Sequence, residues 1–411
     1  MRQVVITGIG VVTSVGNTKD EFWHCLVEGE SGVGNIEQFD TEKLNIKVGA
    51  EVKNFHGSDH FSKSQYSLLD RFSQFAVVAA REAVSDSGVT ISDEISLKTA
   101  VIIGTGAGGQ NTQDDNYRKI YSEGTRRLHP FTIPRLMINS AVSHVTMDLG
   151  IRGPAYAIAS ACASGSHAIG QALNLIRSGV TEIALTGGTE ACITFGTMKG
   201  WEALRVMAPD TCNPFSADRR GMVLGEGAAM FVLESLENAQ ARGAKIYAEL
   251  AGVGMSADAS NIVEPSVDGA ARAINEALRE AGLEPEDIDY VNAHGTATKL
   301  NDITETMALH KSLGESAKKV SVSSTKSMHG HALGAAGAIE CAVTALAVFY
   351  GIVPPTINFT EPDKECDLDY TPNTARKTKI RAAISNSFAF GGLNAVLALR
   401  KVKKGSKNNI N

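Results

Sequence analysis

The residue best placed to act as a nucleophile is Cys162, which lies between a predicted strand and a predicted helix. The apolar run over residues 155–158 is typical of a buried strand, and residues 167–177 follow a helical pattern. The small residues between them predict a sharp turn, with the thiol at the N-terminal end of the helix. Because N–H groups there favour negative charge, we expect the pKa of Cys162 to be lowered toward the thiolate. A cysteine that only packs in the core is the alternative interpretation.

Basic side chains follow two further predicted strands. His294 comes directly after the apolar run 288–293, within the segment NAHGTAT. Lys326 and His331 lie in KSMHGHALGAAG, a segment rich in Gly and Ala that opens a helix. A single histidine at a strand end is usually a core residue. Two such segments, a cysteine at a helix start and the glycine pair Gly391-Gly392 together predict an active site.

Strands and helices alternate along the chain, and the same order of elements occurs twice. We expect strands at residues 3–7, 99–104, 155–159 and 183–187, and again at 247–254, 288–293, 320–323 and 382–388. Such alternation predicts mixed sheets covered by helices, an α/β class. We therefore expect two similar halves, residues 1–250 with the cysteine and residues 251–411 with the two histidines.

Composition excludes several classes of function. The chain has 411 residues, 43% hydrophobic residues and a formal net charge of −6, which gives no reason to expect binding to nucleic acid or to a membrane surface. Its six cysteines form no CxxC pair, so neither a disulfide framework nor a metal site is predicted. The first residues enter a strand pattern directly, and we see no apolar run of membrane-spanning length. We expect a cytoplasmic protein.

One glycine-rich segment resembles a nucleotide-binding motif. Residues 104–109 satisfy the GxGxxG pattern, and residues 8–10 also predict a glycine turn. However, residues 117–127 are polar and loop-like, where a dinucleotide-binding unit needs a second strand ending in an acid. We therefore interpret residues 104–109 as a turn that needs close backbone approach, and no nicotinamide cofactor is expected.

The motifs SACASG, NAHGTAT and STKSMHGHALGAAG together resemble the β-ketoacyl-acyl carrier protein synthases of the decarboxylating type, along essentially the whole chain. The resemblance implies the thiolase fold, in which two duplicated halves form a layered αβαβα sandwich. It also implies an acyltransferase whose substrates are carried on the phosphopantetheine of an acyl carrier protein. No cofactor and no metal are expected.

The resemblance assigns the catalytic roles. Cys162 matches the nucleophile that holds the acyl chain as a thioester. His294 and His331 match the two histidines that stabilise the enolate formed when malonyl loses CO2. Lys326 matches a lysine that orients the site, and the N–H groups of Cys162 and Phe390 match the oxyanion hole.

Further positions are assigned in the same way. Glu340 and Asp302 are expected to support the site, and Phe390 to gate it. Thr296, Thr298, Trp201, Phe388 and Ala107 are expected to contact the pantetheine arm or the acyl chain, with core packing as the alternative for Trp201. Arg205 and Lys63 are expected to dock the carrier protein. His329 is predicted to be a variable position, since the family pattern places the catalytic histidine second.

The Cys-His-His set favours the elongating class, and three functions remain open within it. Residues 294–306 and 365–370 look more like the catalytic (alpha) ketosynthases of type II polyketide systems, whereas residues 388–394 resemble the fatty-acid enzymes. Nodulation-type ketosynthases share some of these features. We favour the polyketide subunit, with a homodimeric fatty-acid synthase II as the alternative. A non-catalytic chain-length factor is less consistent with Cys162.

The resemblance also implies a partner subunit. The strand before Cys162 is the dimer edge in this family, and an uncovered edge strand is an aggregation hazard. We expect an obligate dimer, either with a chain-length factor or with a second copy of this chain.

Overall fold

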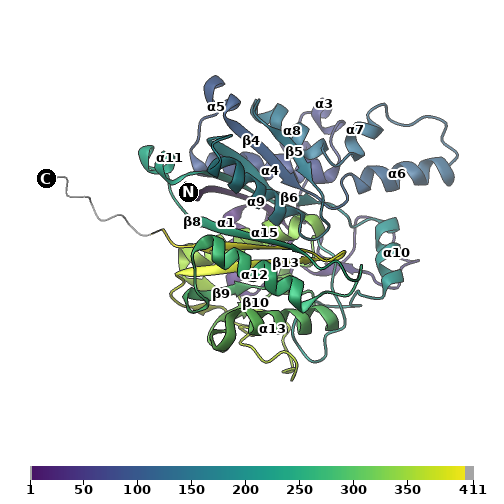
Figure 1. The fold of residues 1–411 in the computed structure, drawn as a ribbon. Coiled ribbons are helices and arrows are strands. Elements are labelled where there is room, and N and C mark those ends of the chain that lie inside the picture. Colours follow the sequence, from purple (N-terminus) through teal and green to yellow (C-terminus); the bar gives the residue numbers. More distant parts are fainter. Residues whose placement is uncertain (1, 403–411) are drawn as a thin grey trace.

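The computed structural model describes residues 2–402 and contains two halves with the same strand topology (Figure 1). The N-terminal half has strands β1 (Val4–Thr13), β4 (Thr99–Gly104), β5 (Ala155–Ile158), β6 (Ile183–Glu190) and β7 (Gly227–Ser235), in the spatial order β5-β4-β6-β7-β1. The C-terminal half has β8 (Ala248–Ala257), β9 (Ile288–Asn292), β10 (Ser321–Ser323), β13 (Ala382–Ala389) and β14 (Leu393–Arg400), in the order β10-β9-β13-β14-β8. Counted from the start of each half, the two orders are identical.

The pairing directions repeat as well. In each half the three strands farthest from the junction are parallel, and the remaining two pairings are antiparallel. The halves join through a short antiparallel contact in which Val5 faces Glu249 and Ile6 faces Ala248. The predicted duplication is therefore visible in the topology. The predicted boundary at residues 250 and 251 lies inside β8, the first strand of the second half.

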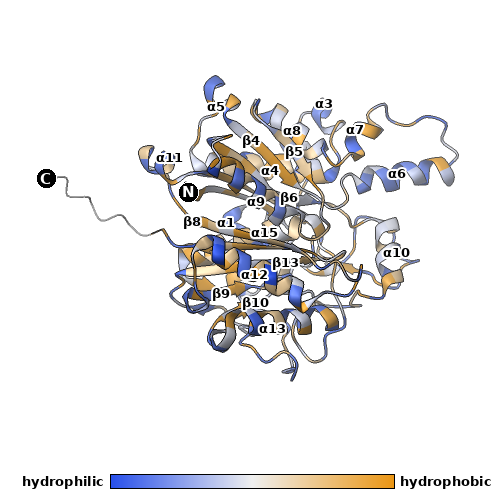
Figure 2. Ribbon diagram, viewed as in Figure 1, coloured by the Kyte–Doolittle hydropathy of each residue, from blue (hydrophilic) through white to orange (hydrophobic). Residues whose placement is uncertain are grey.

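Helices separate and cover the two halves. Helices α9 (Ser164–Arg177) and α15 (Ala336–Tyr350) contact each other in the middle of the molecule, where α9 contacts β4 and β6 and α15 contacts β13 (Figure 1). On the outside, α4 (Arg71–Ser87) packs on β1 and β7, while α12 (Val267–Ala281) packs on β8 and β14. This is the predicted αβαβα layering. In Figure 2 the strands are mostly orange, because they form the core.

Glycine allows the two central helices to approach closely. A Cβ atom at Gly165 would lie 2.8 Å from the backbone N of Ala338, and one at Gly337 would lie 2.3 Å from Ser166 Oγ. The contact brings the start of α9 against the start of α15. Since Cys162 precedes α9 and His331 precedes α15, the packing of these helices sets the distance between the two functional segments.

The remaining elements are shorter or lie at the surface. They are helices α1 (Lys19–Glu28), α2 (Gly57–His60), α3 (Lys63–Tyr66), α5 (Asp93–Leu97), α6 (Gln110–Tyr121), α7 (Thr132–Leu136), α8 (Ser140–Leu149), α10 (Phe195–Leu204), α11 (Leu236–Ala241), α13 (Lys299–Leu313) and α14 (Lys326–His329), the 3-10 helices η1 (Pro285–Asp287), η2 (Gly314–Lys318) and η3 (Leu333–Ala335), and the paired strands β2 (Gly34–Asn35) with β3 (Val48–Gly49) and β11 (Ile352–Val353) with β12 (Arg376–Lys377).

Three local predictions were wrong in whole or in part. The expected turn at residues 8–10 is the middle of β1, where Gly10 lets the backbone of α4 approach: a Cβ there would lie 1.9 Å from Ala79 O. Residues 117–121, the first part of the segment expected to be a loop, belong to α6, a mainly polar helix at the surface, whereas residues 122–127 lie outside helices and strands. Strand β5 was expected to be buried, but Ala155 and Tyr156 are exposed because β5 is the last strand of its half.

The segment Leu333–Tyr350 is long and apolar enough to cross a membrane by composition, which the sequence analysis overlooked. In the structure 89% of this segment is buried inside the protein, mostly as α15. Its apolar character is accounted for by its place between the two halves.

Candidate active site

Cys162 lies on a tight turn between β5 and α9, as predicted. The preceding residue, Ala161, has a φ of 48°, a left-handed conformation that non-glycine residues adopt only where the surroundings enforce it. Ser164 enforces it here: its hydroxyl donates to the Ala161 carbonyl at 2.7 Å and accepts from the Ser160 N–H at 2.8 Å. The turn therefore fixes the sulfur at the N-terminal end of α9.

The predicted thiolate character of Cys162 is wrong for the unliganded protein. The side chain is buried, and this burial raises the pKa of the Cys162 thiol to about 11. The charge of Lys326 and the backbone N–H of Phe390 act in the opposite direction but do not offset the burial. The thiol is therefore protonated at neutral pH, and the helix N-terminus alone does not make it a thiolate.

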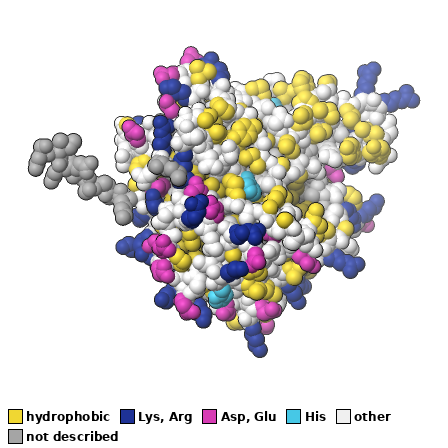
Figure 3. Space-filling model, viewed as in Figure 1, with side chains coloured by type: hydrophobic (Ala, Val, Ile, Leu, Met, Phe, Trp, Pro, Cys, Tyr) yellow, Lys and Arg dark blue, Asp and Glu magenta, His cyan; other side chains and the backbone are white. Residues whose placement is uncertain are grey.

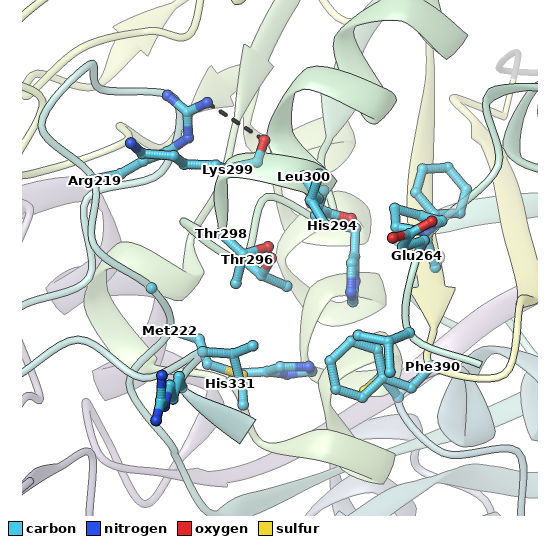
Figure 4. Close-up of a pocket in the computed structure, with 18 of the residues that line it drawn as sticks. Arg219, Met222, Glu264, His294, Thr296, Thr298, Lys299, Leu300, His331 and Phe390 are labelled. Carbon is cyan, nitrogen blue, oxygen red and sulfur yellow. Dashed lines mark hydrogen bonds between the residues drawn. The ribbon is translucent and has the colours of Figure 1, made fainter. Parts of the chain in front are cut away.

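Cys162, His294 and His331 line one cavity of about 540 Å³ (Figure 4). The rings of the two histidines are nearly perpendicular, with centroids 5.4 Å apart. Phe388 and Phe390 line the same cavity, and the Phe388 ring meets the His294 ring edge-on, with centroids 6.1 Å apart. The structure thus brings three of the four predicted catalytic residues, from both halves of the chain, to one cavity.

Lys326 does not line this cavity but lies behind His294. It is fully buried, forms an ion pair with Glu340, and donates from Nζ to the His294 carbonyl O at 2.6 Å. Its Nζ is also 3.4 Å from His294 Nδ1. Because an ammonium group only donates, Nδ1 must accept, which leaves the proton of the neutral imidazole on Nε2.

Both cavity histidines are neutral. Burial holds the pKa of His294 and of His331 well below the usual value, and the positive charge of Lys326 lowers both further. Burial also raises the pKa of Glu340 to about 7, although the paired Lys326 opposes this shift. Two neutral imidazoles facing one cavity can donate N–H groups to an oxygen on which negative charge develops.

Two buried acids hold the loops of the site, and the sequence analysis did not single them out. Glu305 accepts from the N–H groups of His294 at 2.8 Å and Gly295 at 2.7 Å, so it fixes the loop after β9. Glu190, at the end of β6, accepts from the N–H groups of Gly106 at 2.6 Å and Gly334 at 2.9 Å. An acid at the end of an otherwise apolar strand was the available signal for Glu190.

Glu190 also explains the GxGxxG segment. Besides the Gly106 N–H, its carboxyl accepts from the N–H of Ala107 at 3.2 Å and from the Thr105 hydroxyl at 3.0 Å. These backbone donors, which cradle a phosphate in a nucleotide-binding loop, are occupied by the protein itself. The interpretation as a tight turn agrees with this geometry.

The mouth of the cavity is lined by polar and charged side chains. Thr296 and Thr298 line it, with their hydroxyl oxygens 2.9 Å apart, and Trp201 packs on Phe390 with ring centroids 5.7 Å apart. The exposed charged residues that line the cavity mark its mouth; they are Arg205, Asp218, Arg220, Glu264 and Lys299. Arg219 also lines the cavity but is buried. Figure 4 shows Thr296, Thr298 and His294 on one side and His331 on the other.

The other predicted residues lie outside this cavity. Asp302 is buried beneath its wall, where burial raises its pKa to about 7 and its Oδ2 is 3.4 Å from Arg219 Nε. Ala107 packs against the apolar cluster that contains Cys162. Lys63 is exposed on α3 and does not line the cavity. Within residues 2–402 we find no group of three or more His, Cys, Asp or Glu side chains arranged to hold a metal ion.

Comparison with known proteins identifies the family. The sequence matches "Beta-ketoacyl synthase, N-terminal domain" over residues 1–239 and "Beta-ketoacyl synthase, C-terminal domain" over residues 247–360. It is 48% identical to Nodulation protein E of Rhizobium sp. (strain N33) over 401 residues, covering 98% of this chain and 100% of the relative. It is 43% identical to 3-oxoacyl-[acyl-carrier-protein] synthase 2 of Staphylococcus aureus (strain N315) over 407 residues, covering 97% and 98% of the two chains.

Solved structures agree with this family. "The ishigamide ketosynthase/chain length factor" matches with a TM-score of 0.94 and 38% identity, covering 98% of this chain and 100% of the other. A type II polyketide ketosynthase, bound to a hexaketide and in complex with its acyl-carrier protein, matches with a TM-score of 0.88 and 33% identity over the same shares. These likenesses confirm the thiolase fold. The chain therefore belongs to the β-ketoacyl synthase family, acyltransferases that form carbon–carbon bonds by condensation.

Proposed function

We propose that this chain is an elongating β-ketoacyl synthase in which Cys162 holds the acyl chain and His294 and His331 stabilise the malonyl enolate. The observation that carries the proposal is that these three side chains line one cavity in which both imidazoles are neutral. Neutral imidazoles are suited to donating hydrogen bonds to an enolate oxygen. The burial of Cys162 shields the thioester that it forms from water.

The first half-reaction loads the enzyme. The Cys162 sulfur attacks the acyl thioester on the carrier protein, a new carbon–sulfur bond forms, and the bond to the pantetheine sulfur breaks. The proton lost by Cys162 ends on the released pantetheine thiol. Because burial raises the pKa of Cys162 to about 11, this proton leaves only as the thioester approaches.

The second half-reaction forms the carbon–carbon bond. The bond between the malonyl α-carbon and its carboxylate breaks, CO2 leaves, and the electron pair forms an enolate whose oxygen accepts from His294 and His331. The enolate carbon then attacks the Cys162 thioester, and the resulting oxyanion accepts from the N–H groups of Cys162 and Phe390. Collapse of this intermediate expels the Cys162 sulfur, which takes up a proton from water.

The mouth of the cavity suits a carrier protein with a pantetheine arm. Thr296 and Thr298 offer hydroxyl groups along the entrance, and Trp201 offers an apolar wall. Arg205 is exposed at the same mouth and forms no ion pair within the described residues, so it is available to an acidic partner. We assign the docking of acyl carrier protein to Arg205 together with Lys63.

A second subunit is supported by the exposed apolar surface. Hydrophobic side chains gather over α6, α7, α8 and β5 (Figure 3); they are Tyr117, Tyr121, Phe131, Ile133, Met137, Ile138, Met147 and Tyr156. Strand β5 pairs only with β4 among residues 2–402, which leaves its outer backbone edge open. An open edge beside an apolar patch is typical of a stable subunit interface.

For the pathway, we propose the catalytic (alpha) ketosynthase of a type II polyketide system, paired with a chain-length factor. The likeness to the ishigamide ketosynthase/chain length factor supports this proposal. A homodimeric fatty-acid elongating enzyme is the second candidate, favoured by the 43% identity to 3-oxoacyl-[acyl-carrier-protein] synthase 2. The presence of Cys162 disfavours a non-catalytic chain-length factor.

The experiment is a product analysis with malonyl-acyl carrier protein, carried out with the chain alone and with a candidate chain-length factor. A polyketone that forms only with the partner supports the polyketide subunit. Extension of ordinary acyl-carrier thioesters by the chain alone supports the fatty-acid enzyme. Absence of CO2 release under both conditions would overturn the proposed condensation.

A further inference from the structure

His329, two residues before His331, has a defined structural environment although its position was predicted to be variable. Its ring is buried, with Nδ1 2.9 Å from the Gly330 carbonyl O and Nε2 3.0 Å from Thr325 Oγ1. Because a carbonyl only accepts, Nδ1 carries the proton and Nε2 accepts from the Thr325 hydroxyl. Burial lowers the pKa of His329 to about 3, so this neutral form persists at every working pH.

His329 contacts Gly330, the residue of this segment whose backbone is least restricted by its own side chain. Gly330 has a φ of 69°, and a Cβ there would lie 2.9 Å from Ala50 Cβ, so glycine is required. A glycine restrains its own peptide plane only weakly. The peptide that joins Gly330 to His331 is instead held from outside: the His329 ring donates to its carbonyl, and its N–H donates to Val223 O at 2.7 Å.

The His331 side chain depends on this backbone support. Its Nδ1 has no hydrogen-bond partner within residues 2–402, so no side-chain contact to that atom fixes the ring. The His331 carbonyl accepts from the Gly225 N–H at 3.0 Å, which holds the segment on the other side. The direction of the ring therefore follows from the orientation of the backbone at residues 330 and 331.

We propose that His329 is a positioning residue: its Nδ1–H holds the Gly330 carbonyl and thereby directs the His331 ring into the cavity. The inference rests on the proposed function of His331. Thr325 continues the support, since its Oγ1 is 3.4 Å from Asn292 Nδ2 at the end of β9. A buried chain of polar groups thus connects the core of the C-terminal half to the segment that carries His331.

Two polar variants test this role. His329→Asn keeps an amide donor close to the place of Nδ1, whereas His329→Gln moves its amide toward the place of Nε2 and loses that donor. We expect the glutamine variant to release CO2 from malonyl-acyl carrier protein on the order of tenfold more slowly than wild type. We expect the rate at which acylated carrier protein acylates Cys162 to be unchanged in the glutamine variant. We expect the asparagine variant to approach wild type in both reactions.

The outcomes are distinguishable. Equal rates of CO2 release in the asparagine, glutamine and wild-type proteins would overturn the inference and leave the proposed function intact. Equal losses of acylation and of CO2 release would also overturn it, because they indicate a general structural role. If the glutamine variant does not fold, His329→Leu, which also lacks the donor, replaces it. A wild-type protein that releases no CO2 would overturn the proposed function and this inference together.

Discussion

Replacing Lys326 by methionine separates the role of the buried cation in the site from its role in the fold. Lys326 is fully buried between Glu340 and the loop that carries His294. Methionine keeps much of the apolar length of the side chain but removes the charge and all its donors. The variant leaves Glu340 buried without a cation and leaves His294 Nδ1 without the group that fixes its tautomer.

The expected loss of stability depends on pH. Removing one partner of a buried ion pair costs about 3–5 kcal/mol, less whatever the remaining group recovers by protonation. Burial already raises the pKa of Glu340 to about 7 from an ordinary value of 4.5, and the loss of Lys326 raises it further. A carboxyl group with a raised pKa in the folded state supports folding below pH 4.5, and this support is lost as the pH rises through the folded value. The variant should therefore lose more unfolding free energy at pH 8 than at pH 5.5.

A double variant gives the matched control. Lys326→Met with Glu340→Leu removes both buried charges and should recover most of the stability. It should not recover CO2 release from malonyl-acyl carrier protein, which we expect to stay about 10²-fold below wild type because the His294 proton is no longer fixed on Nε2. Urea unfolding and CO2 release are measured on wild type and both variants. Recovery of CO2 release together with stability would contradict the role of Lys326 in orienting His294.

Three further predictions concern the cavity and its mouth. Alkylation of Cys162 by iodoacetamide, followed on its peptide by mass spectrometry, should accelerate about tenfold per pH unit between pH 7 and 9, because burial raises its pKa; a plateau below pH 8 would contradict this shift. Ala107→Phe should shorten the longest product, because Ala107 packs on the cluster around Cys162; unchanged product length by mass spectrometry counts against that placement. Arg205→Glu combined with Lys63→Glu should raise KM for substrates on the carrier protein severalfold while leaving turnover of acyl-pantetheine unchanged. Equal effects on both substrates would contradict the assignment of these residues to docking.

Sequence reasoning located the functional segments because each adjoins a strand end. Cys162 and His294 follow short apolar runs, and His331 lies in a segment rich in Gly and Ala that opens a helix. These patterns can be recognised without knowledge of the packing. The duplicated order of strands was predictable because strand and helix patterns alternate in the same way in both parts of the sequence. The resemblance to a family then supplied the roles, which the spacing of the residues alone does not give.

Most of the features that sequence reasoning missed depend on contacts between distant parts of the chain. The apolar run of β5 predicted a buried strand, but periodicity does not show that the strand lies at an open edge. The helix N-terminus predicted a lowered pKa for Cys162, whereas burial by residues from both halves raises it. Glu190 accepts hydrogen bonds from backbone N–H groups that lie 84 and 144 residues away in the chain. Glu305 accepts hydrogen bonds from backbone N–H groups that lie 10 and 11 residues away. No local sequence pattern indicates either set of contacts.

The most direct test of the proposed mechanism is the mass of the Cys162 peptide after incubation with acyl carrier protein that is loaded with an acyl chain. We predict one acyl adduct per chain, located on Cys162, that disappears when malonyl-acyl carrier protein is added and CO2 is released. Cys162→Ala should give no adduct. An acyl group on another residue, or an adduct on Cys162 that malonyl-acyl carrier protein does not remove, would contradict the proposed condensation.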